Sequence, residues 1–271
     1  MPSRDKQQVA RQFSRAATSY DRAAGIQQRV VTSLLEQLKQ NSLDTPSEHT
    51  GMLAGHWLDI GCGTGVALPH LRHMGASNVT GIDLAEGMLS VARAHSDDKT
   101  QLILADADHL PMDNHCADGL ISSLMLQWSE APVTTLTEWH RVLKPRSPVA
   151  VATLLPGTQS ELLQAWQQID DRQHINDFIS RENIIEAFTQ AGFVVEHTQS
   201  ERLTEHYASM TQLLRGLKDI GATNVNAGRR AGLGGRQALK ELEEVYPTEE
   251  DNGNIRFPLS YEVLWIYART V

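Results

Sequence analysis

The sequence contains only two cysteines, Cys62 and Cys116, and it lacks any long hydrophobic run. A chain of 271 residues can stabilise its fold by burying apolar surface, so a disulfide framework is neither indicated nor needed. The longest aliphatic run, residues 149–155, is far shorter than the roughly 18 residues that a membrane span requires, and the N-terminus has no signal-like apolar segment. We therefore expect a cytoplasmic protein that has no membrane partner.

Basic residues are scarce relative to acidic ones, with 24 Lys and Arg against 33 Asp and Glu and a net charge of −9. This balance argues against broad nucleic-acid binding. Hydrophobic residues make up 41% of the chain, which excludes a wholly disordered protein. Among the histidines, His70 and His73 have helical spacing, but no further ligands follow at a recognisable interval, so we expect no metal.

Short apolar segments alternate with helical patterns through the middle of the chain. The expected strands are residues 56–60, 78–83, 101–104, 117–122 and 148–154. Alternation of this kind predicts right-handed crossover units, and therefore an α/β fold with a mostly parallel central sheet and helices on both faces.

The remaining segments are expected to add helical elements to this single domain, which would span residues 1–271. Apolar residues at helical spacing predict helices between residues 4 and 40, and residues 41–55 are typical of a linker. Beyond residue 156 we expect helices at 160–171, 181–191, 209–220 and 236–245, and strands at 193–197 and 261–268. The predicted regions are an N-terminal helical lid (about 1–45), a cofactor-binding core (about 56–156), a helical insert and lid (about 157–191 and 203–250) and a closing strand (about 260–268).

A glycine-rich turn follows the first expected strand in the sequence LDIGCGTG, residues 58–65. Gly61, Gly63 and Gly65 are spaced by two, whereas dinucleotide-binding folds favour GxGxxG. With Asp59 the pattern is DxGxGxG. Such a turn lets the backbone approach a ligand closely and presents free N–H groups at a helix start. It is expected to hold the polar part of a cofactor.

Two further acidic positions follow the next two expected strands. Asp83 ends the second strand, where a carboxylate can accept both hydroxyls of a ribose, and Asp106 with Ala107 follows the third, where it can face an adenine amine. Asp108 is an alternative to Asp106. Each feature alone is explained equally well by a tight turn or a solvated strand end. All three, in order on consecutive strands, favour a nucleoside cofactor.

Four segments carry a family resemblance across residues 56–155: LDIGCGTG, GIDLAEGML, LADADHLPM and LTEWHRVLKP. In these the sequence resembles class I S-adenosylmethionine-dependent methyltransferases, which have a Rossmann-like fold. The resemblance implies that S-adenosylmethionine is the cofactor, with its methionine portion at the glycine loop, its ribose at Asp83 and its adenine at Asp106. The full set that it implies is Asp59, Gly61, Gly63, Gly65, Asp83, Leu84, Met88, Asp106, Ala107, Ser122 and Ser123. One departure is that Arg146-Ser147 follows Lys144-Pro145 where the family usually has Gly-Gly.

A narrower resemblance covers nearly the whole chain. It is carried by residues 13–27 (FSRAATSYDRAAGIQ), 123–128 (SLMLQW), 165–178 (AWQQIDDRQHINDF) and 217–229 (LKDIGATNVNAGR). These segments are similar to the malonyl-acyl carrier protein O-methyltransferases of biotin synthesis. The resemblance implies methyl transfer to the free carboxylate of a malonyl thioester, on acyl carrier protein or on coenzyme A. The methyl ester would prime pimeloyl synthesis.

This chemistry needs positioning more than acid or base catalysis, because a malonyl carboxylate is already ionised at pH 7. Tyr20 is our candidate catalytic residue, as a hydrogen-bond donor or as a side chain that closes the site; packing of a helix explains it equally well. Gln127 and Trp128 follow the fourth strand, at the edge where open α/β sheets bind ligands, so they are candidate substrate-binding residues. Trp128 could equally be core.

Basic residues are concentrated in residues 215–240, which contain six of them and one acidic residue. Arg215 and Lys218 are candidate partners of the substrate carboxylate, although a solvated helix face also explains them. Arg229, Arg230 and Arg236 are candidate docking residues for an acidic carrier protein, with solvated loop charges as the alternative.

Three other functions remain open from the sequence. One is a methyltransferase of the same fold that acts on another carboxylic acid or a quinone precursor. Another is a protein that binds the cofactor without catalysis. An RNA methyltransferase ranks last, because the chain lacks an Asn-Pro-Pro-Tyr-like motif after the fourth strand and an extended basic stripe.

Overall fold

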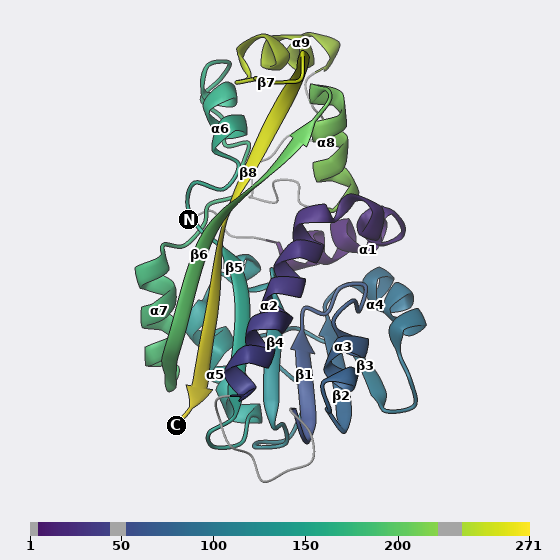
Figure 1. Cartoon of the computed structure of the whole chain (residues 1–271), viewed down its shortest axis with the longest axis vertical. Coiled ribbons are helices and arrows are strands. Elements are labelled where there is room, and N and C mark those ends of the chain that lie inside the picture. Colours follow the sequence, from purple (N-terminus) through teal and green to yellow (C-terminus); the bar gives the residue numbers. More distant parts are fainter. Residues whose placement is uncertain (1–4, 44–52, 222–234) are drawn as a thin grey trace.

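A computed structural model describes residues 5–43, 53–221 and 235–271 (Figure 1). The helices are α1 (Lys6–Ala23), α2 (Gly25–Leu43), α3 (Leu68–His73), α4 (Glu86–Ala92), α5 (Pro132–Val142), α6 (Ser160–Gln167), α7 (Arg181–Gln190), α8 (Met210–Asp219) and α9 (Gly235–Val245). The strands are β1 (His56–Ile60), β2 (Asn78–Asp83), β3 (Thr100–Leu104), β4 (Gly119–Ser123), β5 (Pro148–Leu154), β6 (Phe193–Tyr207), β7 (Glu249–Asp251) and β8 (Asn254–Thr270). Short 3₁₀ helices are formed by Arg93–His95 and Leu126–Trp128.

The strands form one sheet in the order β3-β2-β1-β4-β5-β8-β6, with β7 paired to β8. Pairing is parallel from β3 to β5 and antiparallel where β8 joins β5 and β6. The chain order reverses between β1 and β4, which is where open α/β sheets bind ligands. The carboxyl ends of β1, β2, β3 and β4 therefore meet at one edge, as expected from the sequence.

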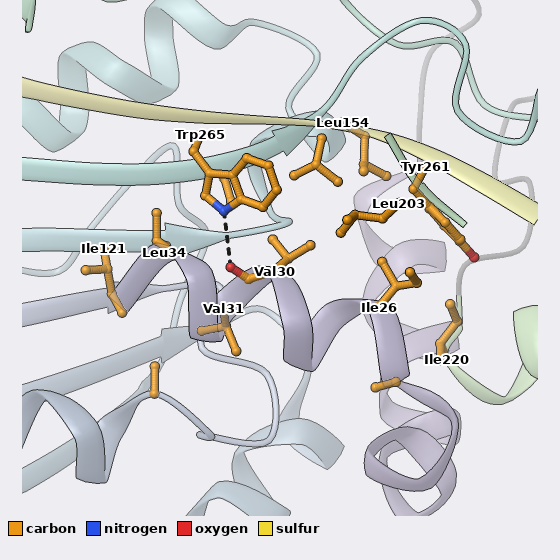
Figure 2. Packing of buried hydrophobic residues seen from close by; sticks show 14 of the residues in the cluster. Ile26, Val30, Val31, Leu34, Ile121, Leu154, Leu203, Ile220, Tyr261 and Trp265 are labelled. Carbon is orange, nitrogen blue, oxygen red and sulfur yellow. Dashed lines mark hydrogen bonds between the residues drawn. The ribbon is translucent and has the colours of Figure 1, made fainter. Parts of the chain in front are cut away.

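Helices cover both faces of the sheet. Successive side chains of each strand point to opposite faces, so neighbouring residues belong to different buried clusters. Trp57 and Trp265 belong to a buried cluster on the face that α2 and α3 cover, whereas their neighbours Leu58 and Leu264 belong to a cluster beneath α5 and α7. Figure 2 shows Val30 and Leu34 of α2 against the first of these faces. The expected mostly parallel α/β fold is confirmed.

The antiparallel pair β6–β8 is longer than the strands expected at 193–197 and 261–268. It runs from the pair Phe193–Thr270 to the pair Tyr207–Phe257, so the segment expected to be helical from residue 203 begins as strand. The prediction was wrong because β6 is an edge strand with many exposed residues, and its sequence lacks an apolar alternation. Helices α6, α8 and α9 lie around the end of this strand pair where Tyr207 pairs with Phe257 (Figure 1).

Other boundaries differ by a few residues. Helix α6 ends at Gln167 rather than at 171, and β4 begins at Gly119 rather than at 117. In the turn after Pro145, Arg146 itself adopts the left-handed conformation with φ of 62°, and the Ser147 amide donates to Thr270 Oγ1 at 2.8 Å. The turn thus forms without the family's Gly-Gly pair.

No helix in the described ranges has both the length and the apolar character needed to cross a membrane.

Candidate functional site

The glycine loop after β1 adopts a left-handed backbone, with φ of 73° at Gly61, 55° at Gly63 and 83° at Gly65. A Cβ atom at Gly61 would lie 2.5 Å from Met125 Cβ, and one at Gly65 would lie 2.9 Å from Ala92 Cβ. A Cβ at Gly63 would meet nothing within 4 Å. Gly61 and Gly65 are therefore required by packing, whereas Gly63 leaves room for a ligand.

Asp83 connects this loop to the end of β2. Its Oδ2 accepts a hydrogen bond from the Gly63 amide at 2.8 Å, and its Oδ1 accepts one from the Ala85 amide at 2.8 Å. Burial raises the pKa of the Asp83 carboxyl, and these backbone donors offset part of that effect. The carboxylate is thus held at the loop where the sequence predicts a ribose.

A first cavity of about 860 Å³ of empty space, partly open to solvent, lies over the loop and the ends of β1 to β4. It contains most of the residues predicted from the sequence: Tyr20, Gly61, Gly63, Asp83, Leu84, Met88, Asp106, Ala107, Ser123 and Trp128. Helix α1 forms its cover through Lys6, Val9 and Phe13.

A second, adjoining cavity is acidic. Asp59 and Asp21 line it together with Gly63 and Thr64, and the Thr64 hydroxyl donates to Asp21 Oδ1 at 2.7 Å. Burial, and after it the charge of Asp83, raises the pKa of Asp59 to about 7. A cationic ligand here would favour the ionised carboxylate.

A third cavity adjoins the other two at Tyr20, which lines all three. Gln127 and Trp128 lie in its wall as predicted, and Trp128 packs edge-on against Phe13 with ring centroids 5.3 Å apart. Its lining is Phe13, Tyr20, Gln27, Leu124, Gln127, Trp128, Leu154, Gln159, Asn176, Phe178, Ile220 and Tyr261. In the described part of the chain, therefore, no charged side chain lines this cavity.

Several predicted residues lie away from these cavities. Ser122 is buried between strands, where its hydroxyl donates to the Ile60 carbonyl at 2.8 Å, and Gly65 packs against α4. Arg215 and Lys218 are exposed on α8 and line none of the three cavities. Their roles in substrate binding remain predictions.

The proposed carrier-docking residues are placed only in part. Arg229 and Arg230 lie outside the described residues. Arg236 belongs to α9, but its side chain is not among those described.

Lys6 is a residue of the site that sequence reasoning missed. Its Nζ lies 2.8 and 2.6 Å from the two carboxylate oxygens of Asp106 and 2.5 Å from Asp108 Oδ2. Partial burial opposes ionisation of Asp106, but hydrogen bonds from Lys6 and from the Asp108 amide outweigh it and lower the pKa. No sequence signal links residues about a hundred positions apart. Asp21, beside Tyr20, was also missed.

Comparison with known proteins bears on this arrangement. The methyltransferase domain family model matches residues 58–151. The malonyl-[acyl-carrier protein] O-methyltransferase of Yersinia pestis is 37% identical over 263 residues, which cover 96% of this chain and 90% of that protein. The chain therefore belongs to the same methyltransferase family as the Yersinia pestis protein. The biotin biosynthesis bifunctional protein BioHC of Teredinibacter turnerae is 38% identical over 280 residues; the match covers 98% of this chain but only 47% of BioHC, so the chain spans about half of that relative.

Solved structures share the fold. The YcgJ protein of Bacillus subtilis superposes with a TM-score of 0.59 at 14% identity, covering 88% of this chain and 98% of that one. The geranyl diphosphate C-methyltransferase of Streptomyces coelicolor, solved with S-adenosyl-L-homocysteine, has a TM-score of 0.53 at 17% identity, covering 90% and 78%. The class I methyltransferase fold expected from the sequence is thus confirmed.

Membership of this family makes the chain an S-adenosylmethionine-dependent methyltransferase. The residues present fit that cofactor. Gly63 leaves open space beside the Asp83 carboxylate, and Asp59 and Asp21 supply negative charge for a cationic ligand. No group of three or more His, Cys, Asp or Glu residues that could hold a metal ion occurs among the described residues.

Proposed function

We propose that this chain methylates the free carboxylate of a malonyl thioester on acyl carrier protein, with S-adenosylmethionine as the methyl donor. The methyl ester would prime pimeloyl synthesis for biotin. The observation that supports this most directly is that Tyr20 joins the predicted cofactor cavity to an uncharged third cavity. The names of the relatives, at 35 to 38% identity over nearly the whole chain, support the choice of substrate.

The residues of the first two cavities would hold the cofactor in three parts. We assign the ribose to Asp83, and the adenine to Leu84, Met88, Asp106 and Ala107. The methionine portion is assigned to the glycine loop with Asp59 and Asp21. When bound, the cofactor supplies a methyl group on a positively charged sulfur.

The malonyl carboxylate needs no general base, because it is ionised at neutral pH. One C–O bond forms while the C–S bond breaks, the electron pair of that bond stays on sulfur, and no proton is transferred. The chain therefore has to orient the carboxylate in line with the methyl group and exclude water. Absence of an obvious acid or base pair from the sequence agrees with this chemistry.

Tyr20 is the side chain best placed for this task. Burial, followed by the charges of Asp83 and Asp21, raises the pKa of its phenol, so the hydroxyl stays protonated at neutral pH. It can therefore donate a hydrogen bond where the cavities meet. Phe13 packs beside it, with ring centroids 6.5 Å apart.

The exposed charges of α8 suit a role outside the cavities. We propose that Arg215 and Lys218 attract the acidic carrier and its thioester arm, together with Arg229, Arg230 and Arg236. A cytoplasmic location and the absence of nucleic-acid partners belong to this proposal. Malonyl-coenzyme A is the alternative substrate.

Mass spectrometry of malonyl-carrier after incubation with S-adenosylmethionine tests the proposal. We expect a gain of one methyl group, about 14 mass units, on the malonyl group. Preference for free malonate or another acid would support a different methyltransferase, and tight cofactor binding without turnover on any thioester acid would support a non-catalytic protein.

A matched pair of glycine variants ties this activity to the cofactor site. Gly63→Ala places a methyl group in the cavity and should abolish the mass gain. Gly253→Ala is the control, because Gly253 also has a left-handed backbone, with φ of 78°, and open space around its Cβ, but it lies in the β7–β8 turn. Equal activity of the two variants would contradict the proposed cofactor site.

A further inference from the structure

The lining of the third cavity combines apolar side chains with neutral polar ones. Its polar lining consists of four carboxamides, Gln27, Gln127, Gln159 and Asn176, and the phenols of Tyr20 and Tyr261. The candidates that the sequence offers as partners of the substrate carboxylate, Arg215 and Lys218, are exposed on α8. The cavity beside the cofactor site thus has hydrogen-bonding groups but no cation in its described lining.

Among these carboxamides, Gln159 has a left-handed backbone. It precedes α6 with φ of 58° and ψ of 31°, a left-handed conformation that is costly for a residue with a Cβ atom. Its backbone N–H donates to the Ser260 carbonyl at 2.6 Å, and this bond holds the left-handed conformation. Although it starts a helix after a loop, Gln159 is only 8% exposed.

Tyr261 of β8 lines the same cavity and directly follows Ser260, which accepts the backbone hydrogen bond of Gln159. Tyr261 is itself 3% exposed, and Figure 2 shows it beside Leu203 near the Ile26 end of α2. A carboxamide has two N–H groups, so the Gln159 side chain has the donors to bind an acceptor on a ligand.

The other carboxamide near the fourth strand is held differently. Gln127 Nε2 donates to the Leu124 carbonyl at 2.8 Å, and its Oε1 accepts from the Thr153 hydroxyl at 3.3 Å. These bonds fix Gln127 as part of the cavity wall. Gln159 is therefore the better candidate to contact a ligand.

Neutral donors suit a carboxylate that must react with a cationic centre. A lysine or arginine paired with the carboxylate would reduce its nucleophilicity and repel the sulfonium. It would also be left buried without a partner once the carboxylate becomes a neutral ester. A carboxamide can donate to the carboxylate before transfer and to the ester carbonyl after it.

We propose that the third cavity is the carboxylate site for the acyl group and that Gln159 donates the hydrogen bond that selects a terminal carboxylate. This inference rests on the proposed function and extends it, because it assigns substrate recognition to a neutral residue. The acyl class that the site takes is a short dicarboxylic thioester.

Calorimetry with two carriers tests the proposal in the presence of S-adenosylhomocysteine. Malonyl-carrier and acetyl-carrier differ by the terminal carboxylate, so the ratio of their affinities reports its recognition. Gln159→Leu should reduce malonyl-carrier binding at least about tenfold and leave acetyl-carrier binding within about twofold. Gln159→Glu should weaken malonyl-carrier binding further by repulsion. Gln164→Glu is the matched control for charge, because Gln164 is exposed on α6, the helix that Gln159 precedes.

The outcomes separate this inference from the function on which it rests. A wild-type protein that does not methylate malonyl-carrier would overturn the proposed function. In the other case, the wild-type protein methylates malonyl-carrier while Gln159→Leu keeps the full malonyl preference or loses binding of both carriers equally. That result would overturn only the role of Gln159. If Gln159→Leu does not fold, Gln159→Asn replaces it, since Asn tolerates left-handed backbone and shortens the reach of the carboxamide. An intermediate loss of malonyl preference is then expected, and an unchanged preference would reject the inference.

Discussion

At the scale of single residues, the charge of Asp59 is expected to depend on whether the cofactor site is filled. Burial and the nearby Asp83 raise its pKa to about 7, and Asp21 and the Cys62 thiol lie in the same cavity. The unfolded chain ionises this group near 3.8, so the folded protein binds the proton more tightly. Its ionisation therefore costs stability progressively as pH rises from about 4 to about 7.

A cationic ligand beside Asp59 reverses this preference. We predict that binding of S-adenosylmethionine lowers the pKa of Asp59, releases a proton below about pH 7, and strengthens as pH rises towards 7. Calorimetry in two buffers of different ionisation enthalpy measures the release. Asp59→Asn should abolish it, and the exposed Asp98→Asn should leave it intact. Equal proton release by Asp59→Asn and the wild-type protein would contradict the assignment.

At the scale of elements, helix α1 is the cover of the site; a cap stabilises its start, and polar contacts join it to the rest of the fold. Asp5 caps its start by accepting from the Gln7 and Gln8 amides. The Ser14 hydroxyl accepts from the Gly87 amide at 3.2 Å, and the Ser19 hydroxyl donates to the Asp219 carbonyl at 3.1 Å. The bond from Ser19 joins the cover to α8, which carries the exposed Arg215 and Lys218.

The ion pairs of Lys6 hold the N-terminal end of α1 against Asp106 and Asp108. Because the Lys6 and Asp106 side chains are about one third exposed, we expect these pairs to contribute only about 1 kcal/mol. Lys6→Met should therefore increase opening of α1 about fivefold, measured by amide hydrogen exchange of residues 6–23. The difference should shrink in high salt.

Arg11→Met is the control for this prediction. Arg11 lies on the same helix, is 59% exposed on its side chain, and approaches Asp5 at 3.6 Å without touching the cavity. It should leave exchange in α1 unchanged. Equal protection of α1 in Lys6→Met and the wild-type protein would show that the ion pairs do not hold the cover.

At the scale of the whole molecule, hydrogen bonds across the core join the two ends of the sequence. Trp265 Nε1 donates to the Val30 carbonyl at 3.2 Å, and the Tyr267 hydroxyl donates to the Leu34 carbonyl at 3.3 Å (Figure 2 shows the first). Both tryptophan and tyrosine belong to β8, while both carbonyls belong to α2. The helix that follows the cover is thus bound to the strand that closes the sheet.

Trp265→Phe removes one of these bonds and leaves a cavity in the core. We predict a loss of about 2 kcal/mol in the free energy of unfolding, measured by urea denaturation, with an unchanged dependence on denaturant. Val194→Ala, at a position 54% exposed on β6, should change the free energy by less than about 0.5 kcal/mol. A Trp265→Phe protein as stable as the control would mean that α2 is not held at this point.

Much of the cofactor site could be predicted from sequence because its geometry is local. Gly63, Asp83 and Asp106 each follow a strand within a few residues, and parallel pairing brings the ends of those strands to one edge. The parts that could not be predicted depend on distant contacts. Lys6 meets Asp106 only because α1 folds back over the sheet, and Gln159 bonds to Ser260 only because the start of α6 lies beside β8.

The sequence by itself determined the strand–turn–helix units, the glycine-rich turn and the order of the acidic residues, because these follow from spacings within short stretches of chain. Only the tertiary structure decided that Lys6 of α1 pairs with Asp106, that β6 extends to Tyr207, and that carboxamides rather than Arg215 and Lys218 lie in the wall of the third cavity. These features arise from packing between segments far apart in the chain, and such contacts leave no periodic trace in the residues that make them.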